Sequence, residues 1–226
     1  MQLNRKGRSR LSDHWPRAVR YTHLMGPTSA EIVPLPFVYP YAVVFWALFA
    51  AVFIPEFLLI RKLGRQRPAR QDRGSTRVIM LGNMLGSCIA FGSASALPRA
   101  TLVPHRVALF WAGIVVIAAG GALRRHCFRM LGASFKAVVE VRPDQAVVER
   151  GAYRFVRHPS YAAAVLLFVG IGLALTNWVS LLALILMLAI VYGYRIHVEE
   201  SALAETLGAA YRSYMARTKR IVPFIW

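Results

Sequence analysis

The sequence predicts an all-α polytopic membrane protein with about five transmembrane helices. Of its 226 residues, 57% are hydrophobic, and several apolar runs approach or exceed the roughly 20 residues that a helix needs to cross a bilayer. The 28 Lys and Arg residues outnumber the 10 Asp and Glu residues and cluster between the apolar runs, as the positive-inside rule describes. We therefore expect the net charge of +18 to face membrane lipids and not nucleic acid.

Two apolar spans follow a basic extension. Residues 1–36 are rich in Pro, Gly and Ser, so we expect partial order there. The first span covers residues 37–60 and contains Glu56, near enough to its end for the carboxylate to reach water or Arg61. A functional role is the alternative for this acid inside a membrane span. The second span, residues 78–97, has small side chains at four-residue spacing, which lets another helix approach closely.

A third span, residues 107–123, precedes the longest polar segment in the body of the protein. This segment, residues 124–160, holds eight basic residues. Polar and apolar side chains alternate within it at residues 136–142, so an extended strand and a surface loop both fit.

The last two spans form a helical hairpin. Residues 161–175 and 178–194 are apolar, and the connection between them is so short that the helices must be antiparallel. We expect the second helix to continue to Leu203, with Arg195 and Glu199 on one face, and Gly208 to end the helix.

Basic residues also predict the orientation. Twenty lie in the first and third connections and in the C-terminal tail, whereas two lie in the second connection. The positive-inside rule therefore places the large loops and the C-terminus in the cytoplasm.

A cluster of polar residues immediately precedes the hairpin. Pro159 disfavours helix at His158 and is well suited to begin a helix itself, so Arg157 and His158 should lie on a loop at a helix N-terminus. Such a site favours an anionic group; anchoring of the helix at the lipid headgroups is the alternative. The two cysteines stand alone and the six histidines show no HxxxH or HExxH spacing, so we expect no metal site.

Two polar stretches together resemble the isoprenylcysteine carboxyl methyltransferase family, integral membrane enzymes that use S-adenosylmethionine. The matching residues are Gly151, Tyr153, Arg154, Arg157, His158, Pro159, Tyr161, Glu199, Glu200, Leu203, Gly208, Tyr211, Tyr214, Arg220 and Pro223. The chain departs from the family pattern at Ala152, Ala163, Leu207 and Ala210.

The resemblance implies a methyltransferase with a cofactor pocket at the cytoplasmic membrane edge. It implies that S-adenosylmethionine is the cofactor and that a lipophilic acceptor, with a carboxylate, thiol or amine, enters from the bilayer. We expect Arg157, Arg195 and Glu199 to be catalytic. We expect the cofactor to be bound by Tyr153, Arg157, His158, Pro159, Tyr161, Glu199, Glu200, Tyr211 and Tyr214.

This interpretation divides the chain into three parts: the extension (1–36), the first three spans (37–131) and a catalytic region with a C-terminal lid (132–226). In the lid, Tyr211 and Tyr214 share a helical face, and Arg220 can fold back toward the loop of Arg157.

Two other functions compete with methyl transfer. An NADPH-dependent membrane reductase of the sterol-reductase type would be expected to carry Asn where Ser160 stands. A non-enzymatic membrane scaffold would explain the basic loops and the small residues of the second span, but not the spacing of the two polar stretches.

Overall fold

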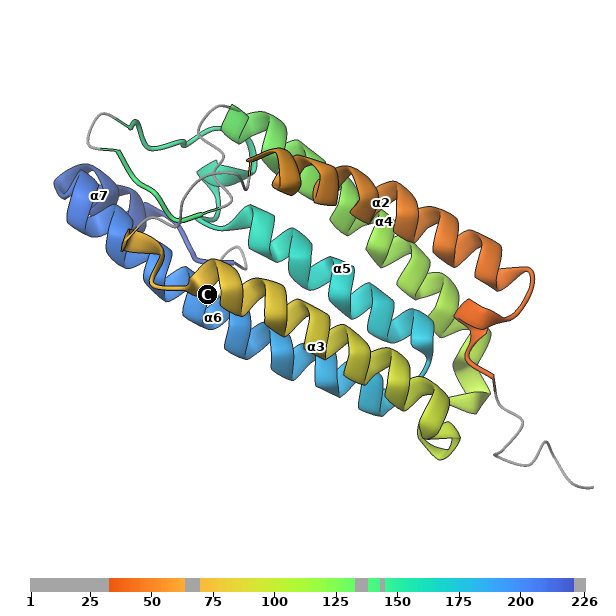
Figure 1. Cartoon of the computed structure of the whole chain (residues 1–226). Helices are drawn as coiled ribbons and strands as arrows, with labels where there is room; N and C mark the ends of the chain where they lie inside the picture. The colour runs from red at the N-terminus through yellow and green to blue at the C-terminus, as the bar shows by residue number, and fades with distance from the viewer. Residues whose placement is uncertain (1–32, 64–69, 133–137, 143–144, 222–226) are drawn as a thin grey trace, which may run out of the picture. The chain divides into compact units, whose positions relative to one another are not determined.

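Six α-helices make up most of the computed structural model, which describes residues 33–63, 70–132, 138–142 and 145–221. They are α2 (Tyr41–Leu63), α3 (Ser75–Ala96), α4 (Arg106–Leu131), α5 (Pro159–Leu175), α6 (Trp178–Leu207) and α7 (Ala209–Arg217) (Figure 1). Short 3-10 helices lie at Leu35–Phe37, Arg70–Asp72, Pro98–Ala100, Val103–His105 and Gly151–Arg154. The long helices run side by side, and α7 lies with the segment before α5 at one end of the bundle (Figure 1).

The predicted fold class is confirmed. In the described part of the chain, α2, α3, α4 and α6 are long and apolar enough to cross a membrane. Helix α5 is also apolar, but its 17 residues make it shorter. The number of about five transmembrane helices therefore remains a prediction.

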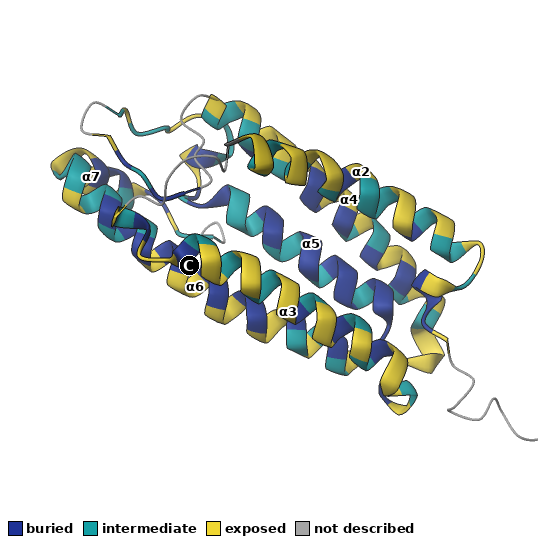
Figure 2. Ribbon diagram, in the orientation of Figure 1, coloured by how far each residue is buried: buried dark blue, intermediate teal, exposed yellow. Residues whose placement is uncertain are grey.

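Helix α5 lies at the centre of the bundle and is the most buried of the long helices (Figure 2). It is apolar on all sides, as expected for a helix surrounded by other helices. Its contact with α4 depends on glycine, because a Cβ atom on Gly113 would lie 2.6 Å from both the Gly170 carbonyl oxygen and the Ala174 nitrogen. The backbones of the two helices thus touch.

The small residues of the second span pack against α6, as the spacing predicted. A Cβ atom on Gly82 would overlap Val191 Cγ2, and one on Gly86 would lie 2.7 Å from Met187 Cγ. At the third position of this stripe, the Ala90 carbonyl oxygen accepts a hydrogen bond of 2.6 Å from the Ser180 hydroxyl.

The hairpin between α5 and α6 turns at Thr176 and Asn177. Thr176 has a left-handed backbone with a φ of 54°. The Asn177 side-chain oxygen caps α6 by accepting hydrogen bonds from the Val179 and Ser180 amides, each 3.1 Å long. Its side-chain amide also donates to the Leu97 carbonyl oxygen at 3.0 Å, so the turn is tied to the end of α3.

Two expectations for the polar residues near the span ends were wrong. Helix α4 continues to Leu131 and does not end near residue 123. Among the described residues, Glu56 pairs with Arg124 of α4 and not with Arg61: its Oε1 lies 2.5 Å from Arg124 Nη2, and both side chains are largely buried. A buried charge needs such a partner. The pair therefore explains both how α2 accommodates the acid and how α4 continues past residue 123 with Arg124 in it.

Pro55 gives α2 and α4 a second contact. Proline has no N–H group, so the carbonyl of Ala51 one turn earlier has no helical donor. Arg125 Nη2 donates to that carbonyl oxygen. Pro55 and Glu56 thus engage the adjacent arginines of α4.

The described part of the alternating segment, residues 138–142, is an irregular loop in which two amides donate to side chains. The Val139 amide donates to Asp72 Oδ1 at 3.1 Å, and the Val141 amide donates to Gln71 Oε1 at 2.8 Å. Most of the N-terminal extension, and Pro223 of the tail, lie outside the described residues. The division of the chain into three parts remains a prediction.

Candidate active site

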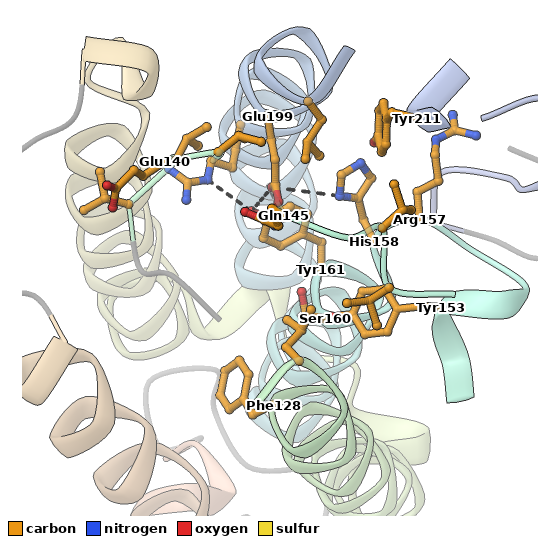
Figure 3. Close-up of a pocket in the computed structure, with 18 of the residues that line it drawn as sticks. Phe128, Glu140, Gln145, Tyr153, Arg157, His158, Ser160, Tyr161, Glu199 and Tyr211 are labelled. Carbon is orange, nitrogen blue, oxygen red and sulfur yellow. Dashed lines mark hydrogen bonds and ion pairs between the residues drawn. The ribbon is translucent and has the colours of Figure 1, made fainter. Parts of the chain in front are cut away.

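A cavity of about 210 Å³ lies at the end of the bundle where α4 and α6 end and α5 begins. Figure 3 shows side chains from these helices and from the loops around them pointing toward it. Apolar side chains of α2, α3 and α4, such as Ile60, Met80 and Phe128, line one part. Among the predicted site residues, the lining contains Tyr153, Arg157, His158, Tyr161, Arg195, Glu199, Tyr211 and Tyr214.

The loop that carries Arg157 and His158 lies where the sequence predicted. Pro159 is the first residue of α5, and the His158 carbonyl oxygen accepts hydrogen bonds from the first turn of that helix. The C-terminal tail, residues 215–221, runs beside this loop: the Arg157 amide donates to the Lys219 carbonyl oxygen at 2.7 Å, and the His158 amide donates to the Arg220 carbonyl oxygen at 2.9 Å. The tail therefore folds back onto this loop, as expected.

Glu200 lies behind the cavity lining and joins the loop to the tail. Its Oε1 accepts a hydrogen bond of 2.7 Å from Arg157 Nε and lies 3.3 Å from His158 Nε2. Its Oε2 accepts one of 3.1 Å from Arg220 Nε. The Arg157 side chain, 9% exposed, also donates to the carbonyl oxygens of Met215 and Thr218. Arg157 thus holds the tail as well as facing the cavity.

A second chain of contacts runs along the cavity. The Tyr161 hydroxyl donates to Glu199 Oε2 at 2.6 Å (Figure 3). It also accepts a hydrogen bond of 3.1 Å from Arg195 Nε. Glu199 Oε2 also lies 3.9 Å from His158 Nδ1. The sequence predicted that Arg195 and Glu199 share a face of α6. The hydroxyl that bonds to both belongs to Tyr161 of α5.

Asp72 binds Arg195, at the end of this series of side-chain contacts. The sequence did not predict this role. Its Oδ1 accepts a hydrogen bond of 2.7 Å from Arg195 Nη1, and the same carboxylate accepts bonds from Ser75, Thr76 and Val139. Burial raises the pKa of the carboxyl, but the hydrogen bonds from Thr76 and Val139 and the charge of Arg195 outweigh it and leave the pKa below its ordinary value. A single acid in a very basic loop was the available signal.

We predict that Asp72→Asn lowers the free energy of unfolding at neutral pH by about 3 kcal/mol, the low end for a broken buried ion pair, because Arg195 keeps other partners. The folded-state pKa of Asp72 is depressed. Its stabilisation is therefore present above the unfolded-state pKa and is lost as the pH falls through the folded-state pKa. Chemical denaturation in detergent should show the difference between variant and parent closing in acid.

The matched control is Glu149→Gln, which breaks an exposed ion pair of 3.2 Å with Arg217. We expect a change within about 0.5 kcal/mol for it. An Asp72→Asn protein as stable as the parent at neutral pH would contradict the role given to Asp72.

The two tyrosines of α7 share a face, as predicted, but their hydroxyls differ. Gly208, with a φ of 57°, ends α6 and turns the chain into α7. The Tyr214 hydroxyl donates to the Tyr153 carbonyl oxygen at 2.6 Å. The Tyr211 hydroxyl is buried and has no hydrogen-bond partner within the described part of the chain. Burial raises the pKa of both, that of Tyr214 to about 12, so both are neutral at physiological pH.

Pro159 and Ala163 lie away from the cavity. Pro159 is fully buried and is not part of the lining, although we expected it to bind the cofactor. Ala163, one of the departures from the family pattern, is buried beside Gly120 of α4. Leu207, another departure, lines the cavity.

Comparison with known proteins supports the resemblance seen in the sequence. Residues 111–205 match the model of the isoprenylcysteine carboxyl methyltransferase (ICMT) family. The chain is 30% identical over 115 residues to protein-S-isoprenylcysteine O-methyltransferase B of Arabidopsis thaliana. That match covers 50% of this chain and 58% of that protein. It is 28% identical over 143 residues to a probable protein-S-isoprenylcysteine O-methyltransferase of Oryza sativa subsp. indica. That match covers 61% of this chain and 74% of that protein.

The fold is also shared with a solved structure. The eukaryotic intramembrane Ras methyltransferase ICMT superposes with a TM-score of 0.62 at 23% identity, covering 84% of this chain and 70% of that one. The similarity in fold therefore extends beyond residues 111–205, the part of the chain that the family model matches.

Proposed function

Because this chain resembles the isoprenylcysteine carboxyl methyltransferase family in sequence over residues 111–205 and in fold, we propose that it is a membrane methyltransferase. Its methyl donor would be S-adenosylmethionine and its acceptor a lipophilic carboxylate, thiol or amine. The observation that carries the proposal is one cavity that joins polar residues of both family-like stretches to apolar side chains of α2, α3 and α4.

The residues around the cavity fit such a donor. Glu199, whose side chain is 30% exposed, suits the ammonium group. The buried Tyr211 hydroxyl has no described protein partner, which costs free energy unless a ligand supplies one. The apolar part of the lining suits the lipophilic part of an acceptor. Arg157, since its guanidinium already holds Glu200 and the tail, would position the site more than it would bind the donor's carboxylate.

The chain would contribute alignment and the exclusion of water. S-adenosylmethionine supplies a methyl group on a positively charged sulfur. A carboxylate or thiolate acceptor arrives already ionised and needs little acid–base help, so Arg195 would orient it while α7 and residues 138–142 keep water out. An amine acceptor would have to lose a proton, and Glu199 or His158 would accept it.

Calorimetry on the detergent-purified protein tests the donor. We expect S-adenosylhomocysteine, the demethylated donor, to bind and NADPH not to bind. Binding of NADPH alone would favour the reductase, and binding of neither would favour the scaffold. Incubation of membranes with radiolabelled S-adenosylmethionine, followed by separate extraction of lipid, protein and water-soluble fractions, tests the acceptor: label confined to the water-soluble fraction would exclude a lipophilic one.

We further propose that the cavity and the C-terminus face the cytoplasm, because the basic connections gather at that end. A cysteine placed at the exposed Arg154 should react with a membrane-impermeant reagent in inside-out vesicles and be protected in right-side-out vesicles. The opposite pattern would reverse the orientation.

A further inference from the structure

We propose that an anionic phospholipid binds in a second cleft, between the last turns of α2 and α4, with its phosphate at Arg125 and Arg129. This cleft has a volume of about 220 Å³. Its lining combines apolar and charged side chains: Val52, Pro55, Glu56, Leu59, Gly121, Arg124, Arg125, Phe128 and Arg129. The proposal does not depend on the methyl-transfer activity.

The cleft begins beside a close contact between the two helices. A Cβ atom on Gly121 would lie 2.8 Å from Val52 Cγ2, so the helices are in close contact at that level. Toward the C-terminal ends of both helices, the cleft opens between Pro55 and Leu59 on one side and Phe128 on the other. Such walls can accept part of an acyl chain.

The charges of the cleft favour an anion. Glu56 is neutralised by Arg124, with Oε1 of the acid 2.5 Å from Nη2. The remaining charged residues of the cleft, Arg125 and Arg129, are both positive and exposed. They share a face of α4 because they are four residues apart. Among the described residues, neither has an acidic partner within ion-pair distance. Arginine binds phosphate oxygens with two parallel hydrogen bonds.

The position along the helices selects a lipid as the source of that phosphate. Both helices are long and apolar enough to cross a membrane, and the arginines lie in the last two turns of α4, the level at which lipid headgroups are expected. A free phosphate would use the arginines but not the apolar walls. A phospholipid would use both.

The cleft also shares a wall with the candidate active site. Arg124 and Phe128 line both cavities, and the Arg124 guanidinium lies 4.9 Å from the centre of the Phe128 ring. The same arginine donates to the Ser160 carbonyl oxygen at 2.6 Å, in the first turn of α5. A bound lipid would therefore support the wall between the two cavities.

The test measures the thermal stability of the detergent-purified protein without any methyl donor, titrated with dioleoylphosphatidylglycerol or with zwitterionic dioleoylphosphatidylcholine. We expect the anionic lipid to raise the unfolding temperature. We expect the Arg125→Gln, Arg129→Gln protein to need at least about tenfold more of it for the same rise, a tenfold change being about 1.4 kcal/mol. Soluble glycerol phosphate should have little effect on either protein.

The matched control is Arg61→Gln, Lys62→Gln, which removes two exposed basic residues at the end of α2 that do not line the cleft. It should respond to the anionic lipid as the parent does. An equal loss of response in both double variants would show general attraction to basic residues and overturn the proposal. So would an equal response to both lipids, or a glycerol phosphate effect as large as that of the lipid. Arg129→Gln alone, which leaves the bond to Ala51 intact, guards against misfolding of the double variant and should lose part of the response.

Discussion

Glu200→Ala is expected to weaken the binding of S-adenosylhomocysteine by at least about 100-fold, which corresponds to about 2.7 kcal/mol. The carboxylate of Glu200 holds Arg157, His158 and Arg220 together from behind the cavity. Loss of one partner of a buried ion pair costs about 3–5 kcal/mol, because the other charge is left unpaired. Arg157 and the tail can relieve that cost only by moving; Arg157 lines the cavity, and the tail pairs with the loop that carries it. Calorimetry of the variant in detergent measures the effect.

Two further variants separate binding from folding. Glu205→Gln changes an exposed acid on the same helix, 3.8 Å from Arg73 at the surface, and should bind as the parent does. Glu200→Gln keeps the shape but not the charge, and we expect intermediate affinity. If Glu200→Ala remains monodisperse and binds as tightly as the parent, Glu200 has no part in building the site.

The double variant Tyr211→Ala, Tyr214→Ala is expected to lose donor binding almost completely while staying in the membrane. Truncating a large buried aromatic side chain costs about 3–5 kcal/mol, and both rings are almost fully buried against the cavity. Without them α7 would no longer exclude water. The apolar spans are unchanged, so the membrane fraction after alkaline extraction should contain as much variant as parent. Calorimetry on that material gives the affinity.

Single phenylalanine variants are the controls, because they remove only a hydroxyl. Tyr214→Phe loses the bond to the Tyr153 carbonyl oxygen and should be less stable by about 1 kcal/mol. Tyr211→Phe loses no bond to a described residue, so the ligand-free protein should be as stable as the parent or more so, yet bind the donor more weakly. If the double alanine variant binds as tightly as the parent, α7 serves as an anchor and not as a lid.

Most of the helices could be predicted because their positions depend on local sequence. Apolar length marked the spans, Pro159 marked the start of α5, and Gly208 marked the end of α6. The extent of α4 could not be predicted in the same way. Its last turns are polar, and they are helical because Glu56 and the Ala51 carbonyl on another helix satisfy Arg124 and Arg125.

The same distinction holds for the candidate site. Two stretches with family-like spacing identified the residues around the cavity, because each stretch is short and carries its own pattern. Asp72 was missed because its meaning depends on Arg195, which lies 123 residues away. Arg157 both faces the cavity and binds the tail, and the second role was missed for a similar reason. Its partners include the backbone carbonyl groups of Met215 and Thr218, and every residue type has a carbonyl, so the sequence does not mark them.

The pairing of the Arg157 loop with the tail has a consequence for how the protein is made. A ribosome synthesises the chain from the N-terminus, and earlier segments fold or insert first. The loop amides of Arg157 and His158 find their acceptors on Lys219 and Arg220, which are translated after all the long helices. The bundle therefore enters the membrane before its cavity has a complete wall, and the site is assembled by the last segment of the described chain to leave the ribosome.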